Sequence, residues 1–591
     1  MKKQFGLPLM LASALAFSAC SSDDVAENGN GSLTDFTNGG YVKMAINMPT
    51  VKSSEGAFKG VNDGYQDGTP AEYEVKNTTV IMFQGNNEND AIFHSAYNIT
   101  DTWNPELAPN GQISSTLQLT KKVNEAAIGS NLYALVVVNN NGLLSVGPDH
   151  KLTVGSDDFT GNFTEFKNKL ATATSVSGTD FSGAGLFMAN APLSKGTGGT
   201  AKSDGPVTTL VNLTSDVYPT ATAAEAKPAA HIYIERGVAK VTFVRPKTDA
   251  SFTTDAFSNG KGVATVTYTM DGWNLDITNK SSFLVRHVNP DWNAYKTDIT
   301  GVTVTNPFRF VGHTEVHDGL YRTYWAEDPN YNSTPAGAFN TVTSVDDINK
   351  PFGEYNPLYC LENTFNVDNQ NQDATTRAIV RVKVKIDGVA GDFYTVNGGK
   401  TTLYSQANLD NLVKNAIITN ADVVTANGGT APNAAAITLR YSAAPDANGE
   451  VKVEGIDLTG VDLSADAVKY NAILDAVNKT VKNITKYVDG YVYYPVRIKH
   501  FGDELTPWAQ AYDANITTGK IYPATKKEER YLGRYGVVRN NWYELEVNSI
   551  KGIGYAVIPP ANNVPDDVLD QYISVKINIL SWAKRSQSED L

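Results

Sequence analysis

Residues 379–386 read Ile-Val-Arg-Val-Lys-Val-Lys-Ile, and this stretch indicates the fold class of the whole chain. Apolar and basic side chains alternate without a break from Val380 to Ile386. Successive side chains of a β-strand point to opposite faces, so one face would be aliphatic and the other basic. Such a strand packs one face on a core and leaves the other in water, which is typical of antiparallel sheets. We therefore predict a half-buried strand here.

Strand patterns recur on both sides of this stretch. Continuous apolar runs at 79–83 and 132–138 are typical of strands in the core of a β-sandwich. Shorter strands are expected at 41–48, 491–499 and 542–547. Asn-Gly pairs, in which both residues tolerate positive φ, indicate hairpin turns at 110–111, 259–260, 397–398 and 448–449. The chain is therefore expected to be all-β.

Helical patterns are few and are expected to be insertions in this β framework. The clearest lie at 163–170, 406–416 and 464–477, the last with Ser464 as the expected N-cap. A boundary is indicated near residue 230, because residues 195–230 are rich in Gly, Thr, Ala, Ser and Pro and a strongly β-forming segment follows at 231–244. We expect an N-terminal domain at 61–228 and a C-terminal domain at 229–591, the second with an insertion near 400–490.

The start of the chain has the layout of an export signal. The basic pair Lys2 and Lys3 precedes an apolar stretch at 7–17, which is shorter than the roughly 20 residues of a membrane-spanning helix. Small residues then lead to a cysteine. We expect a lipoprotein signal peptide at 1–19, with cleavage between Ala19 and Cys20.

Acylation of Cys20 would then hold the precursor on a membrane, because several acyl chains anchor a protein stably. Phe17 departs from the leucine that is usual three positions before such a cysteine, and an ordinary secretory signal with an incidental cysteine is the alternative. Residues 20–40 are rich in Gly, Asn, Ser and Asp and are expected to form a flexible tether.

Composition and motifs argue against several classes of function. The formal net charge is −14, and nucleic-acid binding needs basic patches, so no nucleic-acid partner is expected. The chain has two cysteines; if Cys20 is acylated, Cys360 has no partner and is expected to be a buried structural thiol. No G-x-S-x-G motif or carboxylate pair indicates catalysis, so we expect no enzyme and no cofactor. His313 and His317 lack the intervening Glu of a metalloprotease helix, so no metal site is expected.

Three tryptophans are the residues that could stack on sugar rings. Trp273, Trp292 and Trp325 lie in or near expected strands, where aromatic side chains more often pack in the core or at its rim. Their positions leave open a carbohydrate-binding role.

Five segments in order resemble a known family. They are Asp67–Phe83, Ile234–Val241, Tyr359–Thr364, Val538–Leu545 and Ile577–Trp582. The chain resembles the major subunit of the minor-type (type V) fimbriae of Bacteroidales, the fimbrillin-like lipoproteins. The resemblance implies two transthyretin-like β-sandwich domains and export as an outer-membrane lipoprotein. It also implies removal of the first strand by a protease, after which a strand from a neighbouring subunit fills the groove.

Both partners of such an exchange are found in the sequence. Residues 41–60 would contain the removable first strand and the cleavage loop. The terminal strand carries an aliphatic face, made of Ile573, Val575, Ile577 and Ile579, between polar residues on the other face. We expect it to be the donor strand, since an extended segment can add to an open sheet edge. Membership in the sheet of its own domain is the alternative, and a precursor can combine the two.

The maturation cut is expected at a lysine. Family members are often cut by an arginine-specific protease, but the first arginine here is Arg236, inside the strand expected to open the second domain. Lys59 and Lys52 lie in the appropriate loop, so a protease of different specificity is implied.

The leading hypothesis is a stalk subunit of a cell-surface fimbria that contributes to adhesion and biofilm formation. Its partners would be copies of itself in a head-to-tail filament, anchor and tip subunits, and the maturation protease. The alternative is a glycan-binding surface lipoprotein of a nutrient-uptake system.

Overall fold

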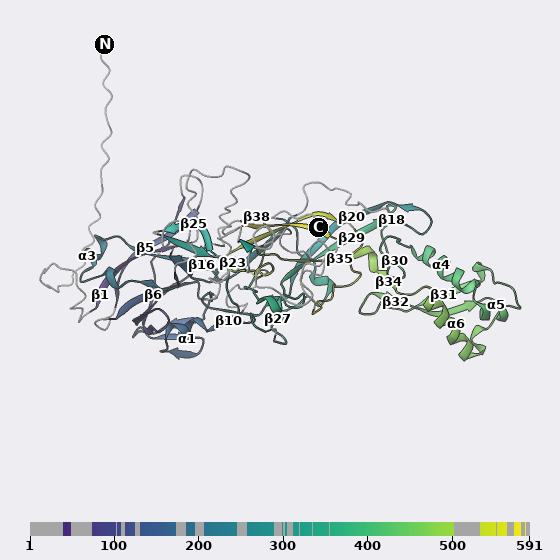
Figure 1. Ribbon diagram of the computed structural model, residues 1–591, viewed down its shortest axis with the longest axis horizontal. Helices are drawn as coiled ribbons and strands as arrows, with labels where there is room; N and C mark the ends of the chain where they lie inside the picture. The colour runs from purple at the N-terminus through teal and green to yellow at the C-terminus, as the bar shows by residue number, and fades with distance from the viewer. Residues whose placement is uncertain are drawn as a thin grey trace, which may run out of the picture.

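The structure is a computed structural model of the 591-residue chain. It describes residues 39–48, 72, 74–101, 103–107, 113–123, 130–172, 185–195, 206–244, 257–288, 298–299, 302–303, 311–317, 319–333, 335–353, 355–501, 532–550, 552–563, 566, 573–580 and 585–586. The elements are mainly strands, and they extend along one axis from β1, β5 and β6 at one end to α4, α5 and α6 at the other (Figure 1). The all-β prediction is therefore confirmed.

One ten-stranded sheet forms the N-terminal half. Its main path runs β3 (Ile92–Ile99), β2 (Thr78–Gly85), β6 (Asn131–Val138), β11 (Met188–Asn190), β16 (Ala230–Arg236), β1 (Gly40–Asn47), β5 (Ile113–Val123) and β4 (Asn104–Leu107). Two short strands, β14 (Val211–Asn212) and β15 (Val217–Tyr218), pair with β6 and β1. The apolar runs at 79–83 and 132–138 lie in β2 and β6, whose side chains are buried, as predicted.

Two sheets form most of the C-terminal half. The first runs β28 (Leu358–Cys360), β17 (Ala239–Val244), β36 (Trp542–Ile550), β37 (Ile573–Leu580) and β38 (Arg585–Ser586). The second runs β20 (Val266–Asp276), β29 (Arg377–Ile386) and β35 (Tyr491–Arg497). Val380, Val382 and Val384 in β29 are buried, whereas Lys385 is exposed. The apolar and basic alternation at 380–386 thus corresponds to a half-buried strand, as predicted.

Strand pairing locates the passage between the two halves. β16 belongs to the N-terminal sheet and β17 to the C-terminal sheet, so the chain crosses between them at residues 237–238. The crossing lies later than the boundary placed at 228, and Arg236 belongs to the N-terminal sheet, not to an opening strand of the second domain. Two further pairs join the halves: β10 (Leu170–Thr172) with β22 (Ser281–Phe283), and β12 (Leu193–Lys195) with β26 (Leu320–Thr323).

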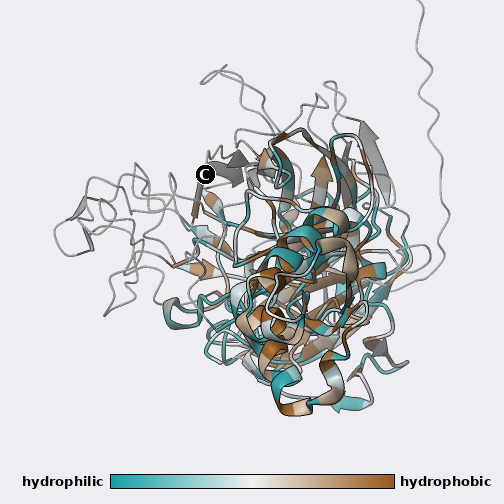
Figure 2. Cartoon of the chain, turned by 90° about the vertical axis from the view of Figure 1, so that its right-hand side faces the viewer, coloured by the Kyte–Doolittle hydropathy of each residue, from teal (hydrophilic) through white to brown (hydrophobic). Residues whose placement is uncertain are grey.

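The insertion near 400–490 has an apolar core of its own. It contains α4 (Gln406–Ile418), α5 (Ala421–Ala426), α6 (Ala467–Thr480), β31 (Ile437–Tyr441) and β33 (Val453–Leu458). Figure 2, viewed from this end, shows helices with both hydrophilic and hydrophobic sides. The predicted N-cap Ser464 is wrong, because the Asp466 side chain accepts from the amides of Val468 and Lys469 and begins α6. The helix expected at 163–170 is shorter, α1 (Phe163–Lys167).

Cys360, Trp273 and Trp325 are core residues. Cys360 is buried and free, and burial raises the pKa of its thiol to about 12, so it is an inert core residue as predicted. Trp273 and Trp325 are buried, so neither offers a ring to a ligand; Trp292 lies outside the described residues. Within the described ranges, no helix is long and apolar enough to cross a membrane. The same ranges hold no group of three or more His, Cys, Asp or Glu side chains suited to a metal ion.

Candidate functional site

The first strand of the chain fills a slot in the middle of the N-terminal sheet. β1 pairs antiparallel with β5 over its whole length, from Gly40 opposite Val123 to Asn47 opposite Thr116. On its other side it pairs first with β15 and then, from Met44 onward, parallel with β16. Removal of β1 would therefore leave two facing rows of unpaired backbone groups, which form a template for another strand.

The slot is also apolar. Four side chains at alternate positions of this segment are buried to 2% exposure or less: Val42, Met44, Ile46 and Met48. At about 1.5–3 kcal/mol for each buried side chain, the four contribute roughly 6–12 kcal/mol before ordering costs. At the rim, the Lys43 ammonium donates to the backbone carbonyls of Glu225 (3.1 Å) and Lys227 (3.3 Å). An open slot would thus expose a substantial part of the core.

The strand predicted to be a donor lies in its own domain's sheet. β37 pairs antiparallel with β36, from Trp542 opposite Leu580 to Ile550 opposite Ile573. On its other side, among the described residues, it pairs only with the two-residue strand β38. This arrangement is the one expected of a precursor in which β37 belongs to the sheet of its own domain. The donor role of Ile573, Val575, Ile577 and Ile579 stays a prediction.

The other predicted site residues lie outside the described residues. They are Ala19 and Cys20 at the signal junction and Lys52 and Lys59 in the cleavage loop.

A cluster of buried ions connects the segment after that loop to both sheets. The carboxylate of Glu72 lies 2.9 Å from the ammonium of Lys240 in β17 and accepts a hydrogen bond from the Tyr359 hydroxyl in β28. The backbone carbonyl of Glu72 accepts from Arg236 Nε in β16, at 3.3 Å. Lys240 also lies 3.8 Å from the centre of the Trp542 ring. Glu72 and Lys240 are both almost fully buried, so their contact is little screened by water.

Two more ion pairs lie at the junction of the halves. The Arg286 guanidinium binds both oxygens of Glu235, with Nε to Oε1 at 2.8 Å, and donates to the Thr323 carbonyl at 2.7 Å. Arg539 Nε lies 3.4 Å from Glu362 Oε1, and burial raises the pKa of that carboxyl. Buried pairs of this kind fix a geometry more than they add stability, because desolvation offsets their attraction.

Two titratable groups at this junction have strongly shifted pKa values with opposite effects on stability. Burial raises the pKa of Asp328 to about 7, even though the amides of Asn330 and Thr364 donate to it. Burial lowers the pKa of His287 to about 4; its ring stacks on Phe283 at 3.8 Å and its Nε2 lies 2.9 Å from the Lys167 carbonyl. The Lys167 carbonyl can only accept, so Nε2 carries a proton in the neutral ring as well. Protonation would therefore keep this bond between the halves but place a charge on a largely buried ring.

We expect His287 to destabilise the chain in acid. Between about pH 6.5 and pH 4, His287 binds a proton in the unfolded chain but not in the folded chain. The stability that the neutral His287 contributes is therefore fully present above about pH 6.5 and is lost as the pH falls toward 4. The limit of the effect is about 3 kcal/mol. Asp328 changes the stability in the opposite sense between about pH 4 and pH 7. The effect of His287 is therefore measured as the difference between the wild type and a His287 variant, in which the contribution of Asp328 cancels. Urea titrations give the difference in unfolding free energy between the wild type and His287→Gln. This difference, wild type minus variant, should be larger at pH 7 than at pH 4.5. An equal difference at the two pH values would contradict this assignment.

All charged members of the cluster except Arg286 lie in the five segments that carry the family resemblance. Their pairing was not predicted. The paired residues are separated by 51 positions (Glu235 and Arg286), 168 (Glu72 and Lys240) and 177 (Glu362 and Arg539). The signal available was the presence of charges inside apolar strand motifs, since an unpaired charge is rarely buried.

Comparison with known proteins adds a family assignment for one end of the chain. Residues 485–588 match the family model for the C-terminal part of fimbrillin, major fimbrial subunit protein type IV. The matched region contains β35, β36, β37 and β38. The resemblance to fimbrillins that the motifs indicate is therefore confirmed in this region. A search among curated protein sequences finds no match.

Several solved structures match this chain at low identity and low TM-score. One is a proposed cell adhesion protein from Parabacteroides distasonis, with 12% identity, 93% of this chain and 99% of that chain covered, and a TM-score of 0.32. Another is the tip fimbrial protein Mfa3 from Porphyromonas gingivalis, with 8% identity, 92% and 100% covered, and a TM-score of 0.29. These scores are too low to support an inference about function.

Proposed function

We propose that this chain is a structural subunit of a cell-surface fimbria and that it polymerises by strand exchange. The observation that carries the proposal is β1, a buried central strand that enters the sheet from the start of the chain. Cleavage in the loop that contains Lys52 and Lys59 would separate β1 covalently from the rest of the subunit. The fimbrillin match over the C-terminal region, which contains β37, supports the same function.

The two strands are suited to exchange by length and pattern. β1 and β37 each span eight residues. β37 has apolar residues at four alternate positions, and four alternate side chains from Val42 to Met48 fill the slot. A neighbour's β37 could therefore restore both backbone ladders and the apolar contacts, as in other cases of strand addition. Each subunit would offer one slot and one donor, which generates an open head-to-tail filament.

Membrane anchoring of the precursor is part of this proposal. Cys20 would carry the acyl chains and hold the precursor on the outer membrane until assembly. We expect Cys20→Ala to abolish acylation and fimbria assembly, because the only other cysteine of the chain, Cys360, is buried and far from the leader. Metabolic labelling with a palmitate analogue measures this directly, and label that persists in the variant would contradict it.

The alternative, a glycan-binding lipoprotein of a nutrient-uptake system, loses the support of Trp273 and Trp325, which are buried. Electron microscopy of surface-sheared material, with antibody against this chain, distinguishes the two functions. We expect filaments that carry the antibody label along their whole length. Sheared material without filaments, together with a surface-exposed monomer, would refute the proposal.

A further inference from the structure

An open cavity of about 560 Å³ lies on the N-terminal half, away from the ion cluster. Three segments line it. β3 contributes Tyr97 and Asn98, and β5 contributes Lys121 and Lys122. The end of β7 (Leu144–Val146) and the turn after it contribute residues 146–148 and His150. Its size lies within the usual range of small-ligand sites, roughly 300–1,000 Å³. Neither the fimbrial proposal nor the fimbrillin match assigns a role to it.

Two contacts hold the imidazole of His150 in the wall of this cavity. Its ring packs on the buried ring of Tyr97, with centroids 4.5 Å apart. Its backbone is left-handed, with φ 62°, a conformation in which Gly and Asn are the usual residues. The Ala96 amide donates to the His150 carbonyl at 2.9 Å, which secures that conformation. A backbone that is fixed in this way holds the side chain in one direction.

The hydrogen bond of this ring also determines which groups it can bind. Nδ1 of His150 lies 3.2 Å from the Ala96 carbonyl oxygen, which can only accept, so Nδ1 carries the proton. In the neutral ring, Nε2 is then an acceptor, which suits a hydroxyl donor. A simple anion such as sulfate has no proton to offer and would not satisfy it.

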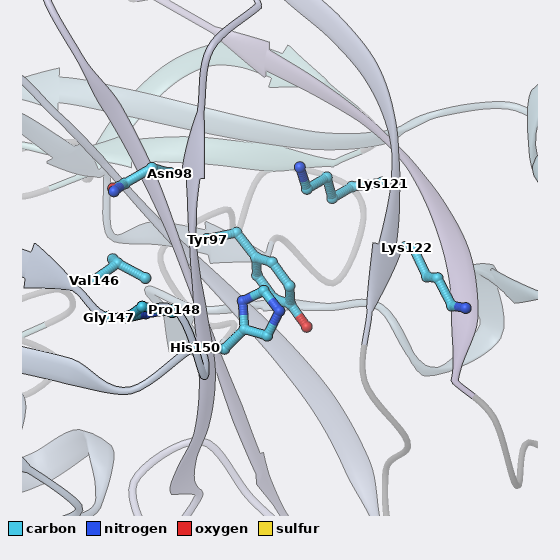
Figure 3. Close-up of a pocket in the computed structure, with 8 residues that line it drawn as sticks. All are labelled: Tyr97, Asn98, Lys121, Lys122, Val146, Gly147, Pro148 and His150. Atoms are coloured by element: carbon cyan, nitrogen blue, oxygen red, sulfur yellow. The ribbon is translucent and has the colours of Figure 1, made fainter.

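A cation completes the site. Lys121 is half-buried and makes no ion pair with any described residue, although the whole chain has an excess of acidic groups. Figure 3 shows Lys121 extending from β5 toward the Tyr97–His150 pair, whereas Lys122 extends away from it. Adjacent side chains of a strand point to opposite faces, which explains the difference. One ammonium and one hydroxyl acceptor therefore lie beside a ring face.

We propose that this cavity binds an acidic saccharide, a sugar ring that carries a carboxylate. The carboxylate would pair with Lys121, and a ring hydroxyl would donate to His150 Nε2 in the plane of the imidazole. Tyr97 acts as a positioning residue because it holds the ring. The proposal does not depend on strand exchange, and a filament built from this chain would present the site once in every subunit.

Isothermal titration calorimetry of the purified chain with a tetragalacturonate, and with its methyl ester as the uncharged control, tests this site. We expect the acid to bind at least tenfold more tightly than the ester, because a charge-assisted contact is lost in the ester. Lys121→Gln should weaken binding of the acid about tenfold. His150→Gly, which keeps the left-handed backbone accessible, should also weaken it about tenfold.

Lys385→Gln is the matched control, because it removes the same charge from an exposed strand position that does not line the cavity. It should change the affinity less than about twofold. Equal losses in Lys121→Gln and Lys385→Gln would mean nonspecific attraction and overturn the proposal. So would equal binding of acid and ester, displacement of the acid by acetate at the same concentration, or no binding of the acid by the folded wild-type chain.

Discussion

An Ile577→Asp variant is expected to form no filaments. If β37 enters a neighbour's slot, the substitution would place an unpaired carboxylate where the slot now holds an apolar side chain of β1, at a cost of several kcal/mol. Lys576→Ser changes the opposite face of the same strand and should be tolerated. Purified precursors cut with trypsin in the loop that contains Lys59 should polymerise and run as ladders on an unheated detergent gel. The wild type and Lys576→Ser should give ladders, and Ile577→Asp should not.

Because β37 also pairs with β36 in its own sheet, the substitution could weaken the subunit itself, and a second experiment separates the two effects. A peptide with the sequence of residues 571–583 should enter the slots of cut wild-type subunits and stop filament growth. The same peptide with aspartate in place of Ile577 should leave growth unchanged. A normal ladder from the Ile577→Asp chain, or equal effects of the two peptides, would identify another segment as the donor.

The need for a cut follows from the geometry of the slot. While β1 is covalently attached, its effective concentration at the slot is high, of the order of millimolar for a short linker, and a neighbour's strand cannot compete. Cleavage turns β1 into a separate peptide that dilutes away once it leaves. The roughly 6–12 kcal/mol of apolar burial is then available to the incoming strand. Proteolysis thus would control when assembly starts, without any change in the contacts that hold the filament together.

The strands could be predicted from the sequence because their signal is local. The alternation in β29 and the apolar runs of β2 and β6 need only neighbouring residues, and all three are strands in the structure. The cap of α6 was misplaced because Ser464 and Asp466 are both good N-caps, and the choice depends on a one-turn 3₁₀ helix that precedes α6. The composition change before 230 did not locate the sheet crossing, since β16 returns to pair with β1.

The ion cluster could not be predicted for a different reason. Glu72 and Glu74 occur in the same short motif, each beside apolar residues, and nothing local distinguishes them. Only the fold makes Glu72 a buried partner of Lys240 and leaves Glu74 in a half-exposed pair with Lys76. The same limit applies to His150, whose left-handed backbone and contact with Tyr97 join segments that are distant in sequence.

Glu72→Gln is expected to lower the unfolding free energy by about 3 kcal/mol. The substitution leaves the buried Lys240 ammonium without its carboxylate, and breaking a buried pair from one side costs about 3–5 kcal/mol. The lower end applies because Lys240 keeps its contact with the Trp542 ring. Glu74→Gln removes the same charge two residues away from an exposed pair and should cost less than about 1 kcal/mol. Urea titration followed by tryptophan fluorescence measures both, and equal losses would contradict the assignment.

The same pair of variants tests whether Glu72 protects the segment after the cleavage loop. Glu72 attaches this segment to β16, β17 and β28, so in the wild type a trypsin cut at Lys59 should leave the rest of the subunit intact. In Glu72→Gln the segment should open locally, and cleavage after the exposed Lys76 should appear in the mass spectrum. Glu74→Gln, which also frees Lys76 from its partner, should show no such cut. If it did, loss of the Lys76 pair alone would explain the cleavage, and Glu72 would have no part in defining where maturation stops.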